Sequence, residues 1–350
     1  MEIASNSGAT LTSIDRAGTN MPSIGGHAVA SRAFLAPMSG VTDIVMRRIA
    51  ARHGAGLVVS EMVASDEFVR GNEEYRIRAE GAGIHPHVVQ LAGCDPHWLG
   101  EAARLAEANG AAIVDINMGC PAKKVTGGWA GSALMRDLDH ALALVEAAVK
   151  AVSVPVTVKM RLGWDDASRN APELARRAVA SGAAMITVHG RTRQQFYKGK
   201  ADWRAIAAVR AQGAFPLVAN GDIHDLDDAR ACLDQSVADF VMIGRAALGR
   251  PWLAGEIGAA LEGRTPPRLS VAQKHAVARE HYEGLLGLLG VAHGARHARK
   301  HLAAYADEAL ASGCVPDAAS RQVLLTSDRP AAVLAALERL FTHECGRVAA

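Results

Sequence analysis

Eight short apolar runs constrain the fold of this chain more than any other feature of its sequence. The repeating pattern, with a spacing of about 25–40 residues, is an apolar run, a polar or glycine exit, and a segment of helical periodicity. Continuous apolar strands that alternate with helices indicate a parallel sheet buried on both faces. Eight such units over about 220 residues favour a (β/α)8 TIM barrel over a doubly wound sheet. The runs lie at residues 33–36, 57–59, 88–91, 113–116, 154–158, 185–188, 215–219 and 240–243.

Helix start signals lie between these runs. Asp95, Asp137, Asn170 and Asp225 each stand directly before a segment of helical periodicity. A short polar side chain in that place can accept hydrogen bonds from the first free backbone amides of a helix. The sequence therefore predicts helices that begin after these four residues.

The pattern divides the chain into three parts. Residues 1–30 show no sustained periodicity and are predicted to be a loose leader. The barrel is predicted over residues 31–262, and the segment Gly263–Pro267, which contains two prolines, is interpreted as a linker. Residues 268–345 contain only helical patterns, so we expect a small all-helical C-terminal domain after the barrel.

Composition excludes several classes of protein. The net charge of +2 over 350 residues rules out a strongly basic chain, so any surface for nucleic acid must be a local patch. The five cysteines are scattered without a CxxC pair, which argues against a disulfide framework and for a reducing compartment. The sequence contains no recognisable secretion signal, membrane-spanning run or metal-binding motif. We expect a cytoplasmic protein that contacts no membrane and holds no metal.

Cys120 is the candidate active-site thiol. It follows the apolar run at 113–116, and Asn117, Gly119 and Pro121 around it end the strand and form a tight loop. Parallel α/β folds place their chemistry on loops at the carboxyl ends of strands. Most free cysteines are small buried apolar residues, but this setting favours a reactive role for Cys120.

Polar residues at the other strand ends should converge with Cys120. Lys159 lies between apolar residues, a costly place for an ammonium group unless it meets an anion. Gly221 and Gly244 follow the seventh and eighth strands, where TIM barrels frequently bind phosphate, and Arg245 adds positive charge. His189 is either a core histidine or a cofactor contact. The remaining strand-end residues are Pro37, Met38, Ser39, Gln90, Asn117, Arg161, Arg191, Asn220 and Asp222.

Basic residues gather in the helical part of the chain. The stretch from Arg264 to His301 holds seven lysines and arginines against two acids, Glu280 and Glu283. It is either a solvated helical face or a surface for a polyanion.

Six ordered motifs resemble those of the tRNA-dihydrouridine synthases, most closely the bacterial B-type branch. The resemblance covers residues 33–255, and ARKHLAAY at 298–305 extends it more loosely into the helical tail. Residues 24–29 fit the entry hairpin of that family only loosely. The six motifs are APMSGVTD at 36–43, DINMGCP at 115–121, VKMRLG at 158–163, VHGRT at 188–192, ANGD at 219–222 and MIGR at 242–245.

The resemblance implies an enzyme and assigns roles to its residues. It implies FMN in a TIM barrel, NADPH or NADH as reductant, and reduction of the C5–C6 double bond of particular uridines in tRNA. Cys120 would be the proton donor, as a protonated thiol, and Asn117, Arg161 and Arg191 would contact the substrate. The basic tail would grip tRNA, and no obligate protein partner is implied, so we expect a monomer. FMN would be held by Pro37, Met38, Ser39, Gln90, Lys159, His189, Asn220, Gly221, Asp222, Gly244 and Arg245.

Three other functions stay open on the residues alone. A flavin barrel of the dihydroorotate dehydrogenase kind also performs C5–C6 chemistry on a pyrimidine, but it needs no basic tail. A tRNA-binding module without catalysis does not explain Cys120 and Lys159. A Schiff-base aldolase built on Lys159 needs no flavin.

Overall fold

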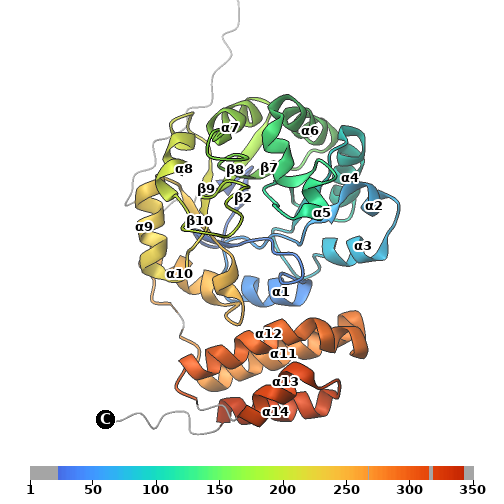
Figure 1. Cartoon of the computed structure of the whole chain (residues 1–350), viewed down its shortest axis with the longest axis vertical. Coiled ribbons are helices and arrows are strands. Elements are labelled where there is room, and N and C mark those ends of the chain that lie inside the picture. Colours follow the sequence, from blue (N-terminus) through green and yellow to red (C-terminus); the bar gives the residue numbers. More distant parts are fainter. Residues whose placement is uncertain (1–22, 267, 315–317, 343–350) are drawn as a thin grey trace, which may run out of the picture.

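The computed structural model describes residues 23–266, 268–314 and 318–342. Its centre is a sheet of eight parallel strands that curls into a ring, with helices outside it (Figure 1). Parallel neighbours need a crossover between them, and helices provide most of these crossovers. In spatial order the strands are β3 (Ala33–Leu35), β10 (Phe240–Ile243), β9 (Leu217–Asn220), β8 (Ala183–His189), β7 (Val156–Arg161), β6 (Ile113–Met118), β5 (Val88–Ala92) and β4 (Val63–Ala64).

Residues 57–59 close the ring. They form isolated parallel bridges, from Val58 to Leu35 in β3 and from Val59 to Val88 in β5. The segment takes the place predicted for the second strand, although its pairing is too short for a continuous strand. The predicted TIM barrel is therefore confirmed.

All four predicted helix starts are confirmed, three of them with a side-chain cap. The carboxylates of Asp95, Asp137 and Asp225 each accept a hydrogen bond from a backbone N–H two or three residues on. Asn170 does not cap its helix: its Nδ2 donates to the Met135 carbonyl at 2.8 Å, and its Oδ1 has no hydrogen-bond partner. The barrel helices are α1 (Ile44–Arg52), α2 (Ser65–Val69), α3 (Glu73–Ala79), α4 (Pro96–Ala108), α5 (Lys123–Thr126), α6 (Leu138–Ala151), α7 (Ala171–Ala180), α8 (Trp203–Arg210), α9 (Leu226–Ser236) and α10 (Leu253–Leu261), with 3₁₀ turns η1 (Gly131–Arg136) and η2 (Arg245–Ala247).

A short hairpin lies within the segment that was predicted to be a loose leader. Strands β1 (Ser23–Ile24) and β2 (His27–Ala28) pair antiparallel around Gly25 and Gly26, whose φ angles are 55° and 89°. Positive φ at both turn residues matches the twist of paired strands and favours glycine. Ile24 is fully buried against the inward side chains of the barrel. The leader prediction is therefore wrong for residues 23–28, and residues 1–22 lie outside the described residues.

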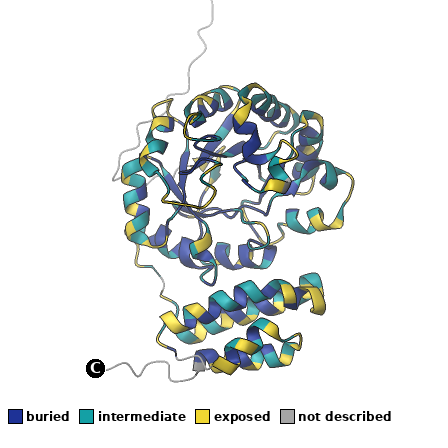
Figure 2. Ribbon diagram, viewed as in Figure 1, coloured by how far each residue is buried: buried dark blue, intermediate teal, exposed yellow. Residues whose placement is uncertain are grey.

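Within the barrel the buried apolar residues form two layers, and the strands between these layers are coloured as buried in Figure 2. One layer fills the inside of the ring and includes Phe34 and Phe240, whose stacked rings lie 4.8 Å apart between centroids. The other lies between the strands and the surrounding helices. Because side chains fill the interior of the barrel, a ligand has to bind at the end of the ring rather than along its axis.

The described residues after the barrel form four helices, as expected of an all-helical C-terminal part. The first of them packs against α1, the last two lie on the side away from the barrel, and Ile49 and Trp252 of the barrel share an apolar core with this part of the chain (Figure 1). No described helix is both long and apolar enough to cross a membrane. Cys314 is disulfide-bonded, a pairing that the scattered cysteine positions did not predict. The helices are α11 (Val271–Leu289), α12 (Val291–Ala311), α13 (Ala318–Thr326) and α14 (Pro330–Thr342).

Candidate active site

A cavity of about 910 Å³ opens at the carboxyl ends of the strands. Its volume lies within the range of sites for cofactors and small ligands. The structure brings together at its wall all the residues predicted for the site except Arg191. These are Pro37, Met38, Ser39, Gln90, Asn117, Cys120, Lys159, Arg161, His189, Asn220, Gly221, Asp222, Gly244 and Arg245.

Asn117 holds the loop that carries Cys120. Its Oδ1 accepts hydrogen bonds from the backbone N–H groups of Gly119 and Cys120, at 3.1 and 2.9 Å. The carbonyl of Cys120 accepts from the backbone N–H and the hydroxyl of Ser132, at 3.0 and 2.9 Å. The backbone of Cys120 is thus fixed on both sides, and its half-buried thiol is carried at the cavity wall.

A buried chain of hydrogen bonds supports Asn117. The Nδ2 of Asn117 donates to Gln90 Oε1 at 2.7 Å, and Gln90 Nε2 donates to Asp115 Oδ2 at 2.7 Å. The hydroxyl of Thr157 donates to the other carboxylate oxygen of Asp115 at 2.5 Å. Burial raises the pKa of Asp115 to about 6, and the two hydrogen bonds act in the opposite direction. Since these bonds engage part of each amide, Gln90 and Asn117 can offer a ligand only their remaining N–H groups and lone pairs.

Lys159 and His189 bring unused hydrogen-bonding capacity to the cavity. Lys159 donates no hydrogen bond to another described residue, and burial, together with the charge of Arg161, lowers its pKa to about 8. The Nδ1 of His189 is buried without a partner. Burial and the surrounding cations, Arg161 first among them, hold the pKa of His189 well below its usual range, so the imidazole is neutral. A cation beside a neutral imidazole suits a ligand rich in carbonyl or anionic oxygens.

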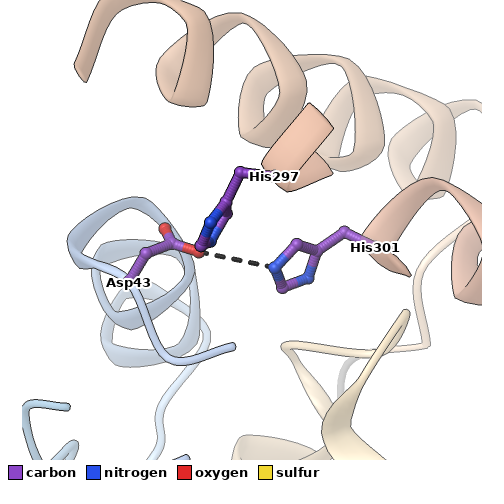
Figure 3. Close-up of side chains that lie close together, drawn as sticks. All are labelled: Asp43, His297 and His301. Atoms are coloured by element: carbon purple, nitrogen blue, oxygen red, sulfur yellow. Dashed lines mark ion pairs between the residues drawn. The ribbon is translucent and has the colours of Figure 1, made fainter. Parts of the chain in front are cut away.

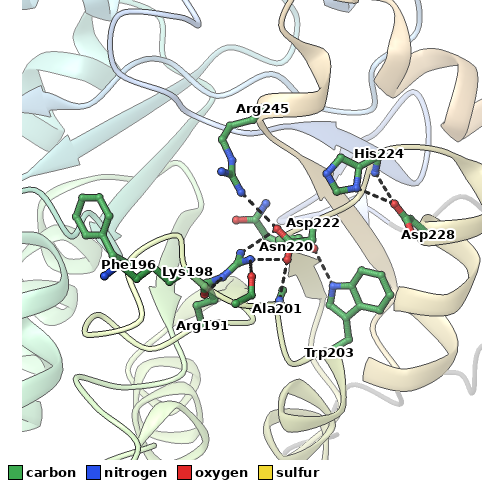
Figure 4. A network of polar contacts seen from close by, with 12 residues as sticks. Arg191, Phe196, Lys198, Ala201, Trp203, Asn220, Asp222, His224, Asp228 and Arg245 are labelled. Atoms are coloured by element: carbon green, nitrogen blue, oxygen red, sulfur yellow. Dashed lines mark hydrogen bonds and ion pairs between the residues drawn. The ribbon is translucent and has the colours of Figure 1, made fainter.

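The loops after β9 and β10 form the wall where phosphate binding was predicted (Figure 4). Gly221 has a φ of 118°, and a side chain there would come within 2.9 Å of the Ala201 Cβ, so the position favours glycine. The carboxylate of Asp222 accepts from Ala201 N–H at 2.8 Å and lies 3.3 Å from the guanidinium of Arg245. The side chain of Arg245 is 60 % exposed and therefore remains accessible to a ligand in the cavity.

Arg191 does not line the cavity, contrary to its predicted contact with the substrate. Its side chain is buried, and its guanidinium donates to Asp222 Oδ1 at 2.9 Å (Figure 4). It also donates to the carbonyls of Lys198 and Gly199, at 3.1 and 2.7 Å. Because these donors are directed into the protein, Arg191 positions Asp222 and the turn at residues 198–199.

Arg161 joins two loops at the mouth of the cavity. Its guanidinium donates to the carbonyls of Gly119 and Phe196, at 2.8 and 2.9 Å. It also lies 5.6 Å from the ring centre of Tyr197, and Arg245 lies 4.9 Å from the centre of the same ring. The cysteine loop and the loop after β8 are therefore held together by one buried arginine.

Sequence reasoning missed Asp115 and two exposed aromatic residues. Asp115 carries a signal, since a carboxylate inside an apolar run needs hydrogen-bond donors around it. Trp129 and Phe196 carry no such signal, because nothing in their local sequence shows that their rings are exposed. They are 59 % and 41 % exposed, and both have a left-handed backbone, with φ of 60° and 54°, which is uncommon for bulky side chains. Arg136 lies between the rings of Trp129 and Trp164, 5.2 and 5.0 Å from their centres.

The fold and the site define a class of TIM-barrel protein with a cavity at the carboxyl ends of its strands, a cysteine loop after β6 and basic groups at the cavity wall. A family model described as "Dihydrouridine synthase (Dus)" matches residues 34–342, which is most of the chain. The chain belongs to the dihydrouridine synthase family.

Named relatives agree with that membership. The chain is 58 % identical to a "Probable tRNA-dihydrouridine synthase" of Rhizobium leguminosarum bv. phaseoli, over 79 % of this chain and 86 % of the relative. It is 47 % identical to "tRNA-dihydrouridine synthase B" of Xanthomonas axonopodis pv. citri (strain 306), over 81 % and 86 %, which confirms the B-type resemblance. Among solved structures, a 2-naphthoyl-CoA reductase complex has a TM-score of 0.55 over 69 % of this chain and 52 % of that one. At 14 % identity that likeness concerns the fold alone.

Proposed function

We propose that this chain is a tRNA-dihydrouridine synthase that uses FMN, with NADPH or NADH as reductant, to reduce the C5–C6 double bond of particular uridines in tRNA. The observation that carries the proposal is the convergence of Cys120, Lys159 and the loops after β9 and β10 on one cavity. Family membership and the names of the relatives support the choice of substrate.

The residues present fit FMN. Lys159 and the unpartnered Nδ1 of His189 can meet carbonyl oxygens, and Arg245 and the Gly221 backbone can meet a phosphate. Residues 37–39 line the cavity from the β3 side. Once bound, FMN supplies the hydride chemistry, while the protein supplies binding, orientation and charge.

Cys120 donates the proton that completes reduction at C5 of the base. Asn117 and Ser132 fix the backbone of its loop, which lines the cavity wall. A thiol acts as a general acid only while it is protonated, which requires a different setting from that of a nucleophilic thiolate. Asn117 and Arg161, which line the same wall, contact the uracil.

A uridine in folded RNA must leave its stack before it can enter the cavity. The exposed rings of Phe196 and Trp129 offer stacking surfaces to unpaired bases, and Arg136 adds positive charge beside Trp129. We expect the protein to act on tRNA as a cytoplasmic monomer, with tRNA and the nicotinamide reductant as its only partners.

The test is a complete reaction with purified components. The full chain is reconstituted with FMN and incubated with NADPH and an unmodified tRNA transcript, and dihydrouridine is measured by mass spectrometry. We expect NADPH to bleach the visible absorbance of the flavin and dihydrouridine to accumulate. Failure to bind flavin would overturn the proposal. Turnover of free dihydroorotate without modification of tRNA would instead favour a function of the dihydroorotate dehydrogenase kind.

A further inference from the structure

A second cluster of polar residues lies where the helical domain meets the barrel (Figure 3). Asp43 directly precedes α1 of the barrel, whereas His297 and His301 lie four residues apart, on one face of α12. One nitrogen of each histidine and one carboxylate oxygen all lie within 4.8 Å of one another. Ligand atoms from two domains therefore face a single point, and none of the three residues lines the active-site cavity.

The two histidines have coordination capacity that the protein does not use. The Nε2 atoms of His301 and His297 are both buried without a hydrogen-bond partner. The His301 residue is only 2 % exposed. The nearest carboxylate oxygen of Asp43 is 3.6 Å from His301 Nε2, which is too long for a hydrogen bond. Buried polar atoms in native proteins almost always have hydrogen-bond partners, so two neighbouring nitrogens without a hydrogen bond leave lone pairs for a ligand.

Imidazole nitrogens and carboxylate oxygens bind metal ions through free lone pairs, and these three residues bring such atoms together at one point.

Neighbouring residues fix the orientation of the carboxylate. The Oδ1 of Asp43 accepts from the backbone N–H groups of Val45 and Met46, at 2.9 and 3.0 Å. Its Oδ2 accepts from His281 Nε2 at 3.1 Å, and His281 Nδ1 lies 3.0 Å from the hydroxyl of Tyr305. Metal-binding carboxylates and histidines are commonly held by outer hydrogen bonds of this kind.

We propose that Asp43, His297 and His301 form a binding site for a divalent transition metal of the zinc class, which links the helical domain to the barrel. Two imidazole nitrogens with one carboxylate suit Zn²⁺, whereas Mg²⁺ and Ca²⁺ prefer oxygen ligands. Arg47 and Lys300 act electrostatically on Asp43 and oppose a cation. The affinity therefore has to come from the imidazole nitrogens, and removing one of them should remove most of it.

The experiment compares two histidines of α12 in the full chain. His297→Asn removes a ligand at a partly exposed position that makes no hydrogen bond, so the variant should fold. His293→Asn is the matched control, because His293 lies one turn away on the same helix and outside the cluster. Each protein is stripped with a chelator, exchanged into metal-free buffer and titrated with ZnCl₂ by calorimetry, and its thermal unfolding is recorded with and without Zn²⁺.

We expect the wild type and His293→Asn to bind one Zn²⁺ and to unfold at a higher temperature with it. We expect His297→Asn to bind at least about 100-fold more weakly and to lose the thermal shift, because one of only three protein ligands is gone. A wild type that binds no Zn²⁺, or a His297→Asn protein that binds it equally well, would overturn the proposal. Neither result bears on the proposed enzymatic function, since the readouts involve neither flavin nor tRNA.

Discussion

Two cysteines line the cavity, and their surroundings differ. Cys120 lies on a loop that Asn117 and Ser132 hold from both sides. Cys94 lies before α4, and its carbonyl is bonded to His140 Nε2 at 2.6 Å. At the scale of single residues the proposed proton donor is therefore distinguished by its setting rather than by its exposure to the cavity.

Replacing Cys120 by alanine should separate the two halves of the proposed reaction. General acids typically contribute about 10²–10⁴-fold to a rate, so dihydrouridine formation by Cys120→Ala should fall by that order. Flavin content and NADPH oxidation should stay close to wild type, as measured by absorbance. Cys94→Ala is the matched control and should form dihydrouridine at close to the wild-type rate. Equal loss of flavin and of product in Cys120→Ala would make this cysteine structural.

The affinity for FMN should fall as the pH rises above about 8. Burial lowers the pKa of Lys159 to about 8, so the ammonium is present below that value and is lost as the pH rises through it. A charge-assisted contact is worth about 1.5–3 kcal/mol, and its loss should weaken FMN binding by about 10–150-fold. Titration of the apoprotein with FMN on both sides of that pH checks this, by quenching of flavin fluorescence. Lys159→Gln should bind weakly at every pH, whereas the exposed Lys150→Gln should behave as wild type. An affinity that does not change with pH would exclude Lys159 from the contact.

At the scale of elements, the sequence predicts what depends on local pattern and misses what depends on distant partners. Strand positions and the Asp95 cap follow from apolar runs and neighbouring residues. Asn170 does not cap its helix, and its Nδ2 is bonded to the Met135 carbonyl, which lies 35 residues away in the chain. The sequence also did not reveal the partner of Arg191. Its guanidinium is bonded to Asp222, which comes 31 residues later in the chain, and without that partner Arg191 was assigned to the substrate. The hairpin at residues 23–28 did carry a local signal, since Gly25 and Gly26 follow an apolar residue.

The hairpin should contribute measurably to the stability of the barrel. Ile24 is fully buried, so Ile24→Ala removes apolar contacts inside the ring and leaves a cavity. Substitutions of this kind cost about 2–5 kcal/mol in the free energy of unfolding. Chemical denaturation of the flavin-loaded protein measures the loss. Val291→Ala, at a position 53 % exposed, is the control and should change stability by less than about 0.5 kcal/mol. A similarly small change in Ile24→Ala would show that the barrel does not depend on the hairpin.

The loop between α5 and η1 should contact RNA through Trp129. The ring is exposed, so Trp129→Ala should leave folding and flavin binding unchanged. Stacking of a base on an aromatic side chain is worth about 1–3 kcal/mol, so tRNA affinity should fall by about 5–150-fold. Trp129→Phe keeps a ring and should restore much of the binding. Gel-shift titration with unmodified tRNA measures the three proteins, and wild-type affinity in Trp129→Ala would remove this loop from the interface.

At the scale of the whole molecule, ion pairs change the interpretation of the basic stretch from Arg264 to His301. Arg264, Lys274 and Arg299 pair with Glu262, Glu308 and Asp328, acids that lie outside the stretch from 264 to 301. The count of charged residues within the stretch therefore leaves these three acids out. Arg279 pairs within the stretch, with Glu283, and Lys300 is half-buried where the domains meet. Among the described residues of the stretch, only Arg268 and Arg296 are exposed basic side chains outside an ion pair.

These two arginines should carry whatever grip the helical domain has on tRNA. Each arginine that contacts a phosphate releases counterions on binding, so its loss should lower the slope of log affinity against log salt by roughly 0.7–0.9. The double variant Arg268→Glu/Arg296→Glu should therefore bind tRNA more weakly at low salt, with a slope smaller by about 1.4–1.8. Both side chains are exposed and outside ion pairs, so the flavin spectrum and the thermal unfolding temperature should not change.

The control has to separate a specific contact from a general change in charge. Arg279→Glu/Arg339→Glu makes the same change in net charge on the same domain, at arginines that are already bonded to Glu283 and Ser320. Filter-binding of unmodified tRNA across a salt series compares this pair with the Arg268/Arg296 pair. If both pairs lower the slope equally, the domain attracts tRNA only through its overall charge. If neither pair changes it, the basic stretch is a solvated face, and the barrel mouth, with Trp129 and Phe196, has to provide the binding.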